Sequence, residues 1–286
     1  MLQEGSAPGA TADTKCAPTL LAADELEAVA VYNEGGRAPH LIVCDHAANR
    51  VPRSLARLGL DAVALGQHIA WDIGALDIAK RLADRLDAPL VHSSYSRLVC
   101  DLNRYPGDPA FAPEQSDGTP IPGNKDLQPA GLHRRYCEIF VPYHETIAAR
   151  LDAFEARSVV PTVLSIHTCT DRMNSAWRPW PISLSYAQDR RISTQLIKHL
   201  KTQDVGPVGD NEPYSVDIGI DFTVCEHAMR RGLAYLQVEF RQDLIGTSAL
   251  ATDWADRFLP SLLYALEDPA VYQRQVVEYP SFGAVD

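Results

Sequence analysis

Three apolar runs of the sequence end in polar side chains that could carry out chemistry. The run LIVCDH ends at His46, TVLSIH ends at His167, and LAYLQVEF contains Glu239 near its end. Short runs of this kind, rich in β-branched residues, predict buried strands. Because ligands of open α/β sheets bind outside the carboxyl ends of the strands, we expect these side chains to share one crevice. Two histidines and a carboxylate suit a catalytic zinc ion, although a single histidine at a strand end is more often a hydrogen-bonded structural residue.

Other polar residues could complete such a site, and each also has a structural interpretation. Asp72 begins a helical stretch, where a carboxylate interacts favourably with the helix dipole whether or not it binds a metal. In the DLNR segment, Arg104 could bind a substrate carboxylate through two hydrogen bonds, or it could pair with Asp101 or another acid of the chain. For His144, on a predicted long helix, a structural role beside the site is favoured over direct contact with substrate.

Glu239 also has two interpretations. Strand alternation places it on the same face as Gln237 and Tyr235. A carboxylate there could be the general base of a hydrolase, or it could be a surface charge or a partner of Arg241.

The elements that must position these residues alternate along the chain. Periodicity predicts strands at 28–32, 40–44, 89–92, 97–102, 162–166, 182–186 and 233–240. It predicts helices at 73–86, 132–154, 191–201, 221–231 and 248–266, with Pro142 bending the second and Pro260 the last. The last helix has an apolar stripe of Leu250, Trp254, Phe258 and Leu262. Residues 105–130 read as a long irregular loop. This order favours a layered α/β domain with helices on both faces of the sheet.

Composition limits the classes of partner. The chain has 286 residues, 46% of them hydrophobic, and 26 basic against 37 acidic residues leave a net charge of −11. No cluster of Lys and Arg is present, which argues against binding of nucleic acid or an anionic membrane surface. No apolar run approaches the ~20 residues of a membrane span, and the start lacks the features of a secretory signal, so we expect a cytoplasmic protein. Residues 1–20 lack periodicity and predict a mobile arm, which leaves 21–286 as a single domain.

The six cysteines show no pattern typical of a metal site. They are dispersed and form no C-x-x-C pair. We therefore predict that all six are reduced and structural.

The ordered motifs of the chain resemble one family. HLIVCDHAANRVP, the Asp of AWDIGA, SRLVCDLNR, PYH, LSIHT and YLQVEFR occur in the order expected of the N-formylglutamate amidohydrolase family, over roughly residues 38–245. That family is similar to zinc-dependent exopeptidases and aspartoacylase-like deacylases. The resemblance implies a single three-layer α/β/α domain with a mixed central sheet. CDHAAN stands here in place of the commoner PHSG at the first histidine, a change that reshapes the pocket.

The resemblance also implies roles for particular residues. His46 and His167 would bind one Zn²⁺ ion, with Asp72 as third ligand, because Asn49 stands where the exopeptidases have their second ligand. Glu239 would be the general base.

Substrate binding is implied in the same way. The pair of Asn103 and Arg104 would bind the substrate carboxylate. His144 and further cations, among them Arg97, Arg178 and Arg241, would complete the pocket of a small anionic N-acyl amino acid.

Three functions remain open from the sequence. The leading one is zinc-dependent hydrolysis of N-formyl-L-glutamate to formate and L-glutamate. The second is deacylation of a different N-acyl amino acid, or exopeptidase activity, in the same site with another pocket. The third is a non-catalytic, carboxylate-binding member of the family.

Overall fold

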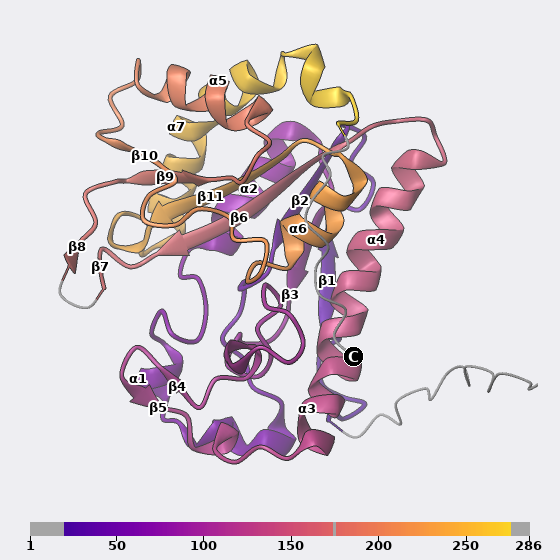
Figure 1. Ribbon diagram of the computed structural model, residues 1–286. Coiled ribbons are helices and arrows are strands. Elements are labelled where there is room, and N and C mark those ends of the chain that lie inside the picture. Colours follow the sequence, from indigo (N-terminus) through magenta and orange to yellow (C-terminus); the bar gives the residue numbers. More distant parts are fainter. Residues whose placement is uncertain (1–19, 174–175, 276–286) are drawn as a thin grey trace, which may run out of the picture.

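A seven-stranded mixed sheet runs through the centre of the molecule (Figure 1). The computed structural model describes residues 20–173 and 176–275. From edge to edge the strands are β1 (Val29–Tyr32), β3 (Leu90–Ser93), β2 (His40–Cys44), β6 (Thr162–Cys169), β11 (Tyr235–Arg241), β9 (Ile182–Ser185) and β10 (Val208–Asp210). Strands β3, β2, β6 and β11 are parallel, whereas β1 and β9 pair antiparallel to β3 and β11. The carboxyl ends of β2, β6 and β11 therefore meet at one edge of the sheet.

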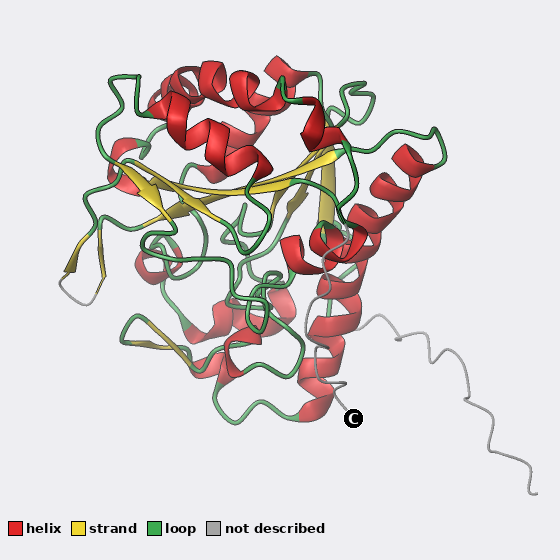
Figure 2. Cartoon of the chain, turned by 45° about the horizontal axis from the view of Figure 1, so that its top comes forward, coloured by secondary structure: helices red, strands yellow, loops and turns green. Residues whose placement is uncertain are grey.

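Helices cover both faces of this sheet, as Figure 2 shows. One layer contains α2 (Ala75–Leu86), α5 (Arg191–Leu200) and α7 (Ser248–Leu266), and α7 packs against both of the others. The other contains α4 (Val141–Glu155) and α6 (Thr223–His227). The predicted three-layer α/β/α domain with a mixed central sheet is confirmed.

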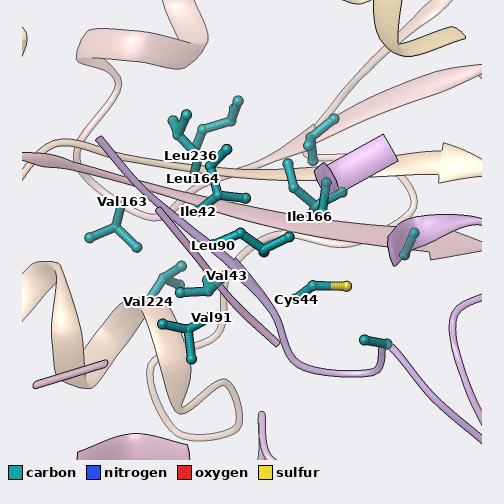
Figure 3. Packing of buried hydrophobic residues seen from close by; sticks show 14 of the residues in the cluster. Ile42, Val43, Cys44, Leu90, Val91, Val163, Leu164, Ile166, Val224 and Leu236 are labelled. Atoms are coloured by element: carbon teal, nitrogen blue, oxygen red, sulfur yellow. The ribbon is translucent and has the colours of Figure 1, made fainter. Parts of the chain in front are cut away.

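The core lies where the central strands meet these helices. Every residue of β2 and β6 is buried. Ile42, Leu164 and Leu236 stand in register on three neighbouring strands, and their side chains lie together in Figure 3. A strand buried on both faces needs a continuous apolar run, which is why these strands were recognisable in the sequence.

The predicted helix 132–154 is interrupted by a wider turn. It consists of α3 (Pro129–Arg135), a π-helical turn (Tyr136–Phe140) and α4. Pro142 lies in the first turn of α4, directly after the π-helical turn. A proline lacks the N–H that an α-helix interior needs, and the changed hydrogen bonding of the π-helical turn accommodates it.

The buried face of α7 contains most of the predicted stripe and two alanines in addition. The bounds of the helix are as predicted, and Thr247 caps its N-terminus by accepting a hydrogen bond from the Leu250 amide. Leu250 itself is 45% exposed, whereas Ala251 and Ala255 are fully buried together with Phe258. Phe258 and Leu262 of the predicted stripe are fully buried, and Trp254 is partly buried against the core, so the predicted stripe is confirmed except at Leu250.

The predicted strand 97–102 is wrong. This segment forms turns, because the Ser96 hydroxyl donates to the Ala70 carbonyl and accepts a hydrogen bond from the Leu98 amide. Leu98 and Val99 are nevertheless fully buried. Their apolar side chains, which suggested a strand, belong to a buried turn instead.

The remaining elements are short. The loop 105–130 contains a hairpin of β4 (Gln115–Ser116) and β5 (Thr119–Pro120), and a second hairpin pairs β7 (Arg172–Met173) with β8 (Ala176–Trp177). α1 spans Ala62–Leu65. Single 3₁₀ turns lie at Pro109–Phe111, Pro122–Asn124, Met229–Arg231, Gln242–Leu244 and Pro269–Tyr272, and Arg53–Gly59 contains two turns separated by a kink.

The cysteine prediction holds in part. Cys44, Cys100, Cys169 and Cys225 are free and buried. Cys137, on the π-helical turn, is disulfide-bonded, so the prediction that all cysteines are reduced is wrong there. A thiol at the surface of a helix is open to oxidation in a way that a buried one is not.

The predicted mobile arm, residues 1–20, lies outside the described residues except for Leu20. Leu20 is buried, and its amide donates to the Glu138 carboxylate. Over 20–173 and 176–275, none of the helices has both the length and the apolar character needed to cross a bilayer.

Candidate functional site

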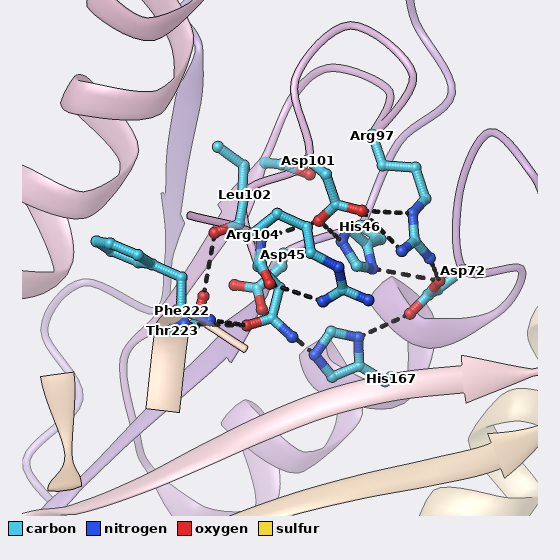
Figure 4. Close-up of polar contacts among 12 residues, drawn as sticks. Asp45, His46, Asp72, Arg97, Asp101, Leu102, Arg104, His167, Phe222 and Thr223 are labelled. Atoms are coloured by element: carbon cyan, nitrogen blue, oxygen red, sulfur yellow. Dashed lines mark hydrogen bonds and ion pairs between the residues drawn. The ribbon is translucent and has the colours of Figure 1, made fainter. Parts of the chain in front are cut away.

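Two histidines and an aspartate form a buried cluster at the carboxyl edge of the sheet. Potential ligand atoms of His46, Asp72 and His167 all lie within 4.8 Å of one another. His167 Nδ1 lies 2.9 Å from Asp72 Oδ2, and His46 Nδ1 lies 3.5 Å from Asp72 Oδ1. Figure 4 shows both rings turned toward the Asp72 carboxylate. The structure thus brings together the three residues that were predicted to bind metal.

The local structure explains how these side chains meet. His46 lies two residues beyond β2, and His167 lies within β6. The Asp72 amide donates to the His46 carbonyl at 2.9 Å, and its carboxylate accepts a hydrogen bond from the Thr168 amide at 3.2 Å. Asn49 takes no part, because its side chain donates to the Leu65 carbonyl.

Each histidine has a further carboxylate on its other nitrogen. His46 Nε2 lies 2.8 Å from Asp101 Oδ1, and His167 Nε2 lies 3.3 Å from Asp45 Oδ2. The Nδ1 atoms of both rings are left facing Asp72, and within the described part of the chain His46 Nδ1 has no hydrogen-bond partner. Two imidazole nitrogens and one carboxylate, with outer carboxylates that orient the rings, fit a Zn²⁺ ion.

Two residues outside the cluster hold these outer carboxylates. The Tyr143 hydroxyl, from α4, donates to Asp45 Oδ1 at 2.7 Å. The Arg97 guanidinium donates twice to Asp101 Oδ2, at 2.7 and 2.9 Å, and lies 3.6 Å from Asp72. A charge network therefore surrounds the cluster (Figure 4).

Asp45 and Tyr143 were missed by sequence reasoning, and Asp101 was considered only as an ion-pair partner of Arg104. The sequence offered one indication for Asp45, which directly precedes the predicted metal ligand His46. The contact of Tyr143 with Asp45 depends on how α4 packs on the sheet, which no local pattern reports.

Glu239 stands beside the cluster. It is the register partner of His167 on the adjacent parallel strand. Together with Gln237, it lines a cleft of about 730 Å³ that also exposes the His46, Asp72 and His167 side chains. Arg241 forms its ion pair with Asp243, so the alternative partner considered for Glu239 is engaged elsewhere.

The electrostatics separate Glu239 from the aspartates. Burial raises the pKa of Glu239 to about 7, and His167 opposes this shift only in part. Burial alone would also raise the pKa of Asp72, but His46 and His167 outweigh it and hold that pKa low. The same holds for Asp101, whose pKa Arg97 and His46 keep well below its usual range. Near neutral pH the aspartates are charged, while Glu239 exchanges a proton.

The predicted substrate-binding residues fall into two groups. Asn103, Arg104, Arg97 and Arg178 line the cleft. His144 is not among the lining residues, and its ring bonds the Leu102 carbonyl and His227 beneath the cleft.

Arg104 is already engaged with an acid. Its guanidinium lies 3.2 Å from Asp221 Oδ1, and the Asn103 side chain donates to the same oxygen at 2.9 Å. The carbonyl oxygen of the Asn103 amide in turn accepts hydrogen bonds from the amides of Phe222 and Thr223. The structural interpretation of Arg104 as an intramolecular ion pair is thus realised, with Asp221 rather than Asp101.

The cleft with its His–Asp–His cluster lies at the carboxyl edge of the central sheet of a three-layer α/β/α domain. The family model of the N-formylglutamate amidohydrolases matches residues 38–246. The chain belongs to the N-formylglutamate amidohydrolase family.

This chain is similar to several solved structures, of which two are described here. A gene product of Agrobacterium tumefaciens is 30% identical, with a TM-score of 0.85, over 88% of this chain and 100% of that one. The N-formylglutamate amidohydrolase from Ralstonia eutropha JMP134 is 18% identical, with a TM-score of 0.58, over 85% of this chain and 98% of that one. The second likeness concerns the fold alone. Among curated proteins, the comparison finds no match.

Proposed function

We propose that this protein is a zinc-dependent amidohydrolase that cleaves the amide bond of a small anionic N-acyl amino acid. N-formyl-L-glutamate, which would give formate and L-glutamate, is the reference substrate. The observation that carries the proposal is the register pairing of Glu239 with His167, which sets a carboxylate of near-neutral pKa beside a His–Asp–His cluster in an open cleft.

His46, Asp72 and His167 would hold the metal, through the two Nδ1 atoms and the aspartate carboxylate. Zn²⁺ bound there would polarise the substrate carbonyl and lower the pKa of water toward ~7. Asp101 would keep the His46 ring in the required tautomer by accepting a hydrogen bond from its Nε2 atom, and the charge of Asp45, 3.3 Å from His167 Nε2, favours a proton on that nitrogen.

Glu239 would move the proton. As a carboxylate it takes a proton from the attacking water, whose oxygen forms the new bond to the carbonyl carbon. Glu239 then donates this proton to the amide nitrogen as the C–N bond breaks, so that the acid and the free amine leave. A pKa of about 7 suits both halves of this cycle at neutral pH.

The test has two parts, one for zinc content and one for hydrolysis, and each can give a negative result independently of the other. Protein purified without chelator is analysed for metal, and a substrate panel of N-formyl, N-acetyl and dipeptide derivatives of glutamate and aspartate is followed by chromatography of the released amine. We expect one zinc per chain and release of the amine from at least one N-acyl compound. Turnover that persists at full rate after metal removal would contradict zinc dependence. Stoichiometric zinc without turnover of any compound would favour the non-catalytic alternative.

A further inference from the structure

The three arginines that line the cleft differ in how their charge is balanced. Arg97 binds Asp101, and Arg104 binds Asp221. Arg178 forms no ion pair within residues 20–173 and 176–275. It is therefore the one arginine in the described lining of the cleft whose positive charge is not offset by a carboxylate.

All of the polar partners of Arg178 are neutral. Its guanidinium donates to the Thr170 carbonyl at 3.5 Å, to Met173 Sδ at 3.0 Å and to the Tyr214 hydroxyl. It also lies 4.9 Å from the centre of the Tyr214 ring. The residue is only 7% exposed. Burying an ionised group without a counter-charge is costly, so an anion entering the cleft would gain more from Arg178 than from either paired arginine.

The surroundings of Arg178 favour one carboxylate over two. Tyr214 and Ile220 line the same cleft and are 42% and 41% exposed, so they offer apolar surface to a ligand side chain. Asp217 also lines the cleft and would repel a second negative charge, whereas the charge of Asp221 is offset by Arg104. Within the described lining there is no further unpaired arginine to receive one.

We infer that Arg178 binds the single carboxylate of an N-acyl amino acid whose own side chain is uncharged. This inference rests on the proposed function and names the substrate class of that site. Arg104, to which the family resemblance assigns the substrate carboxylate, pairs directly with Asp221, which also accepts a hydrogen bond from the Asn103 side chain. A dicarboxylate such as N-formyl-L-glutamate is accepted less well than its uncharged counterpart.

The first experiment compares substrates that differ by one charge. N-formyl-L-glutamine and N-formyl-L-glutamate have nearly the same shape, and N-formyl-L-glutamine amide lacks the α-carboxylate. With the zinc-loaded full chain, we expect kcat/KM for N-formyl-L-glutamine to exceed that for N-formyl-L-glutamate at least about tenfold, and the amide to be the poorest of the three. Equal or higher kcat/KM for N-formyl-L-glutamate would overturn the inference.

The second experiment tests Arg178 itself. Arg178→Gln should raise KM for N-formyl-L-glutamine about 100-fold with little change in kcat, because the bond to the carboxylate is made in ground and transition state alike. The thermal midpoint of unfolding should stay the same or rise, since a buried unpaired charge is removed. Arg172→Gln, on the hairpin that directly precedes Arg178 but exposed and stacked on Trp177, is the matched control and should leave KM unchanged. A lowered midpoint with unchanged KM would assign Arg178 a structural role and overturn the inference.

Titration calorimetry separates this inference from the proposed function. Binding of N-formyl-L-glutamine and N-formyl-L-glutamate to wild-type protein and Arg178→Gln requires no turnover. If no N-acyl amino acid is hydrolysed, the proposed function fails, but a loss of binding confined to Arg178→Gln still supports the carboxylate site. Equal affinity of the two proteins would refute that site even if hydrolysis is observed.

Discussion

Each histidine of the candidate metal centre lies between two carboxylates. His46 lies between Asp72 and Asp101, and His167 lies between Asp72 and Asp45. Burial alone would lower the pKa of His167, but its hydrogen bonds to Asp45 and Asp72 outweigh burial and raise that pKa well above the usual value. A divalent cation would bind in place of the protons that the two histidine rings otherwise take up. Because Asp45 and Asp101 contact the opposite nitrogens of these rings, metal binding should depend on both carboxylates.

Loss of the Tyr143 hydroxyl should weaken metal binding. In Tyr143→Phe, Asp45 loses the hydrogen bond that fixes its orientation toward His167, and we expect the affinity for Zn²⁺ to fall roughly tenfold. The affinity is measured by competition with a chromophoric chelator. Tyr264→Phe, at a residue that is 40% exposed on α7, is the control. Equal zinc affinity of wild type and Tyr143→Phe would show that the hydroxyl does not support the site.

Glu239→Gln should separate metal binding from turnover. Glutamine keeps the shape and hydrogen bonding of the side chain but cannot take up the proton of the attacking water. We expect normal zinc content and a fall in kcat of at least ~100-fold. Glu267→Gln, at an exposed residue after α7, is the matched control. Wild-type turnover of Glu239→Gln on the best substrate, with its metal content confirmed, would exclude Glu239 as the base.

At the scale of elements, the sequence was most informative where burial is complete. β2 and β6 were predicted within a few residues because a strand covered on both faces is rich in apolar residues. The same reasoning failed at 97–102, because a buried turn closed by the Ser96 side chain has the same apolar composition as a strand. Strand ends therefore revealed His46, His167 and Glu239, whereas partners that meet them from other elements, such as Tyr143, could be found only in three dimensions.

The stability of the turn that leads into α2 should depend on Gly74, the residue directly before the helix. Gly74 has φ +82°, and an added Cβ would lie 2.8 Å from the Ile245 carbonyl oxygen. We expect Gly74→Ala to lower the free energy of unfolding by about 1–3 kcal/mol, and to reduce zinc retention because Asp72 is two residues away. Urea unfolding and metal analysis measure the two effects. Gly35→Ala, where the added Cβ meets nothing within 4 Å, is the control, and equal effects of both substitutions would refute the argument.

At the scale of the whole molecule, buried neutral histidines tie stability to pH. His40 at the start of β2 bonds Thr162 at the start of β6, and burial lowers its pKa to about 4 from 6.5. Below pH 6.5 the unfolded chain takes up a proton at His40 that the folded chain takes up only near pH 4. The stability supplied by neutral His40 is therefore present above pH 6.5 and is lost as pH falls toward 4.

Substitution of His40 should flatten this dependence. Between pH 7.5 and pH 5, we expect the free energy of unfolding of wild type to fall by about 2 kcal/mol more than that of His40→Asn. Urea unfolding at the two pH values measures the difference. Because each protein is compared with itself at the two pH values, any effect of the substitution that does not depend on pH cancels. Equal losses of the free energy of unfolding in both proteins would contradict the assignment of this pH dependence to His40.

The pairing of β6 with β11 also constrains how the protein can be made. Val163 pairs with Tyr235, so the two central strands are neighbours in space although α5, α6 and strands β7 to β10 separate them in the chain. On the ribosome, β6 leaves the exit tunnel seconds before its partner, at a synthesis rate of roughly 5–20 residues per second. During that interval a strand that is buried along its whole length in the folded protein has an unpaired edge, which is a template for association with other chains. The nascent protein thus passes through a period of exposure that ends only when β11 has been synthesised, and a chain that terminates before Tyr235 would remain in that state.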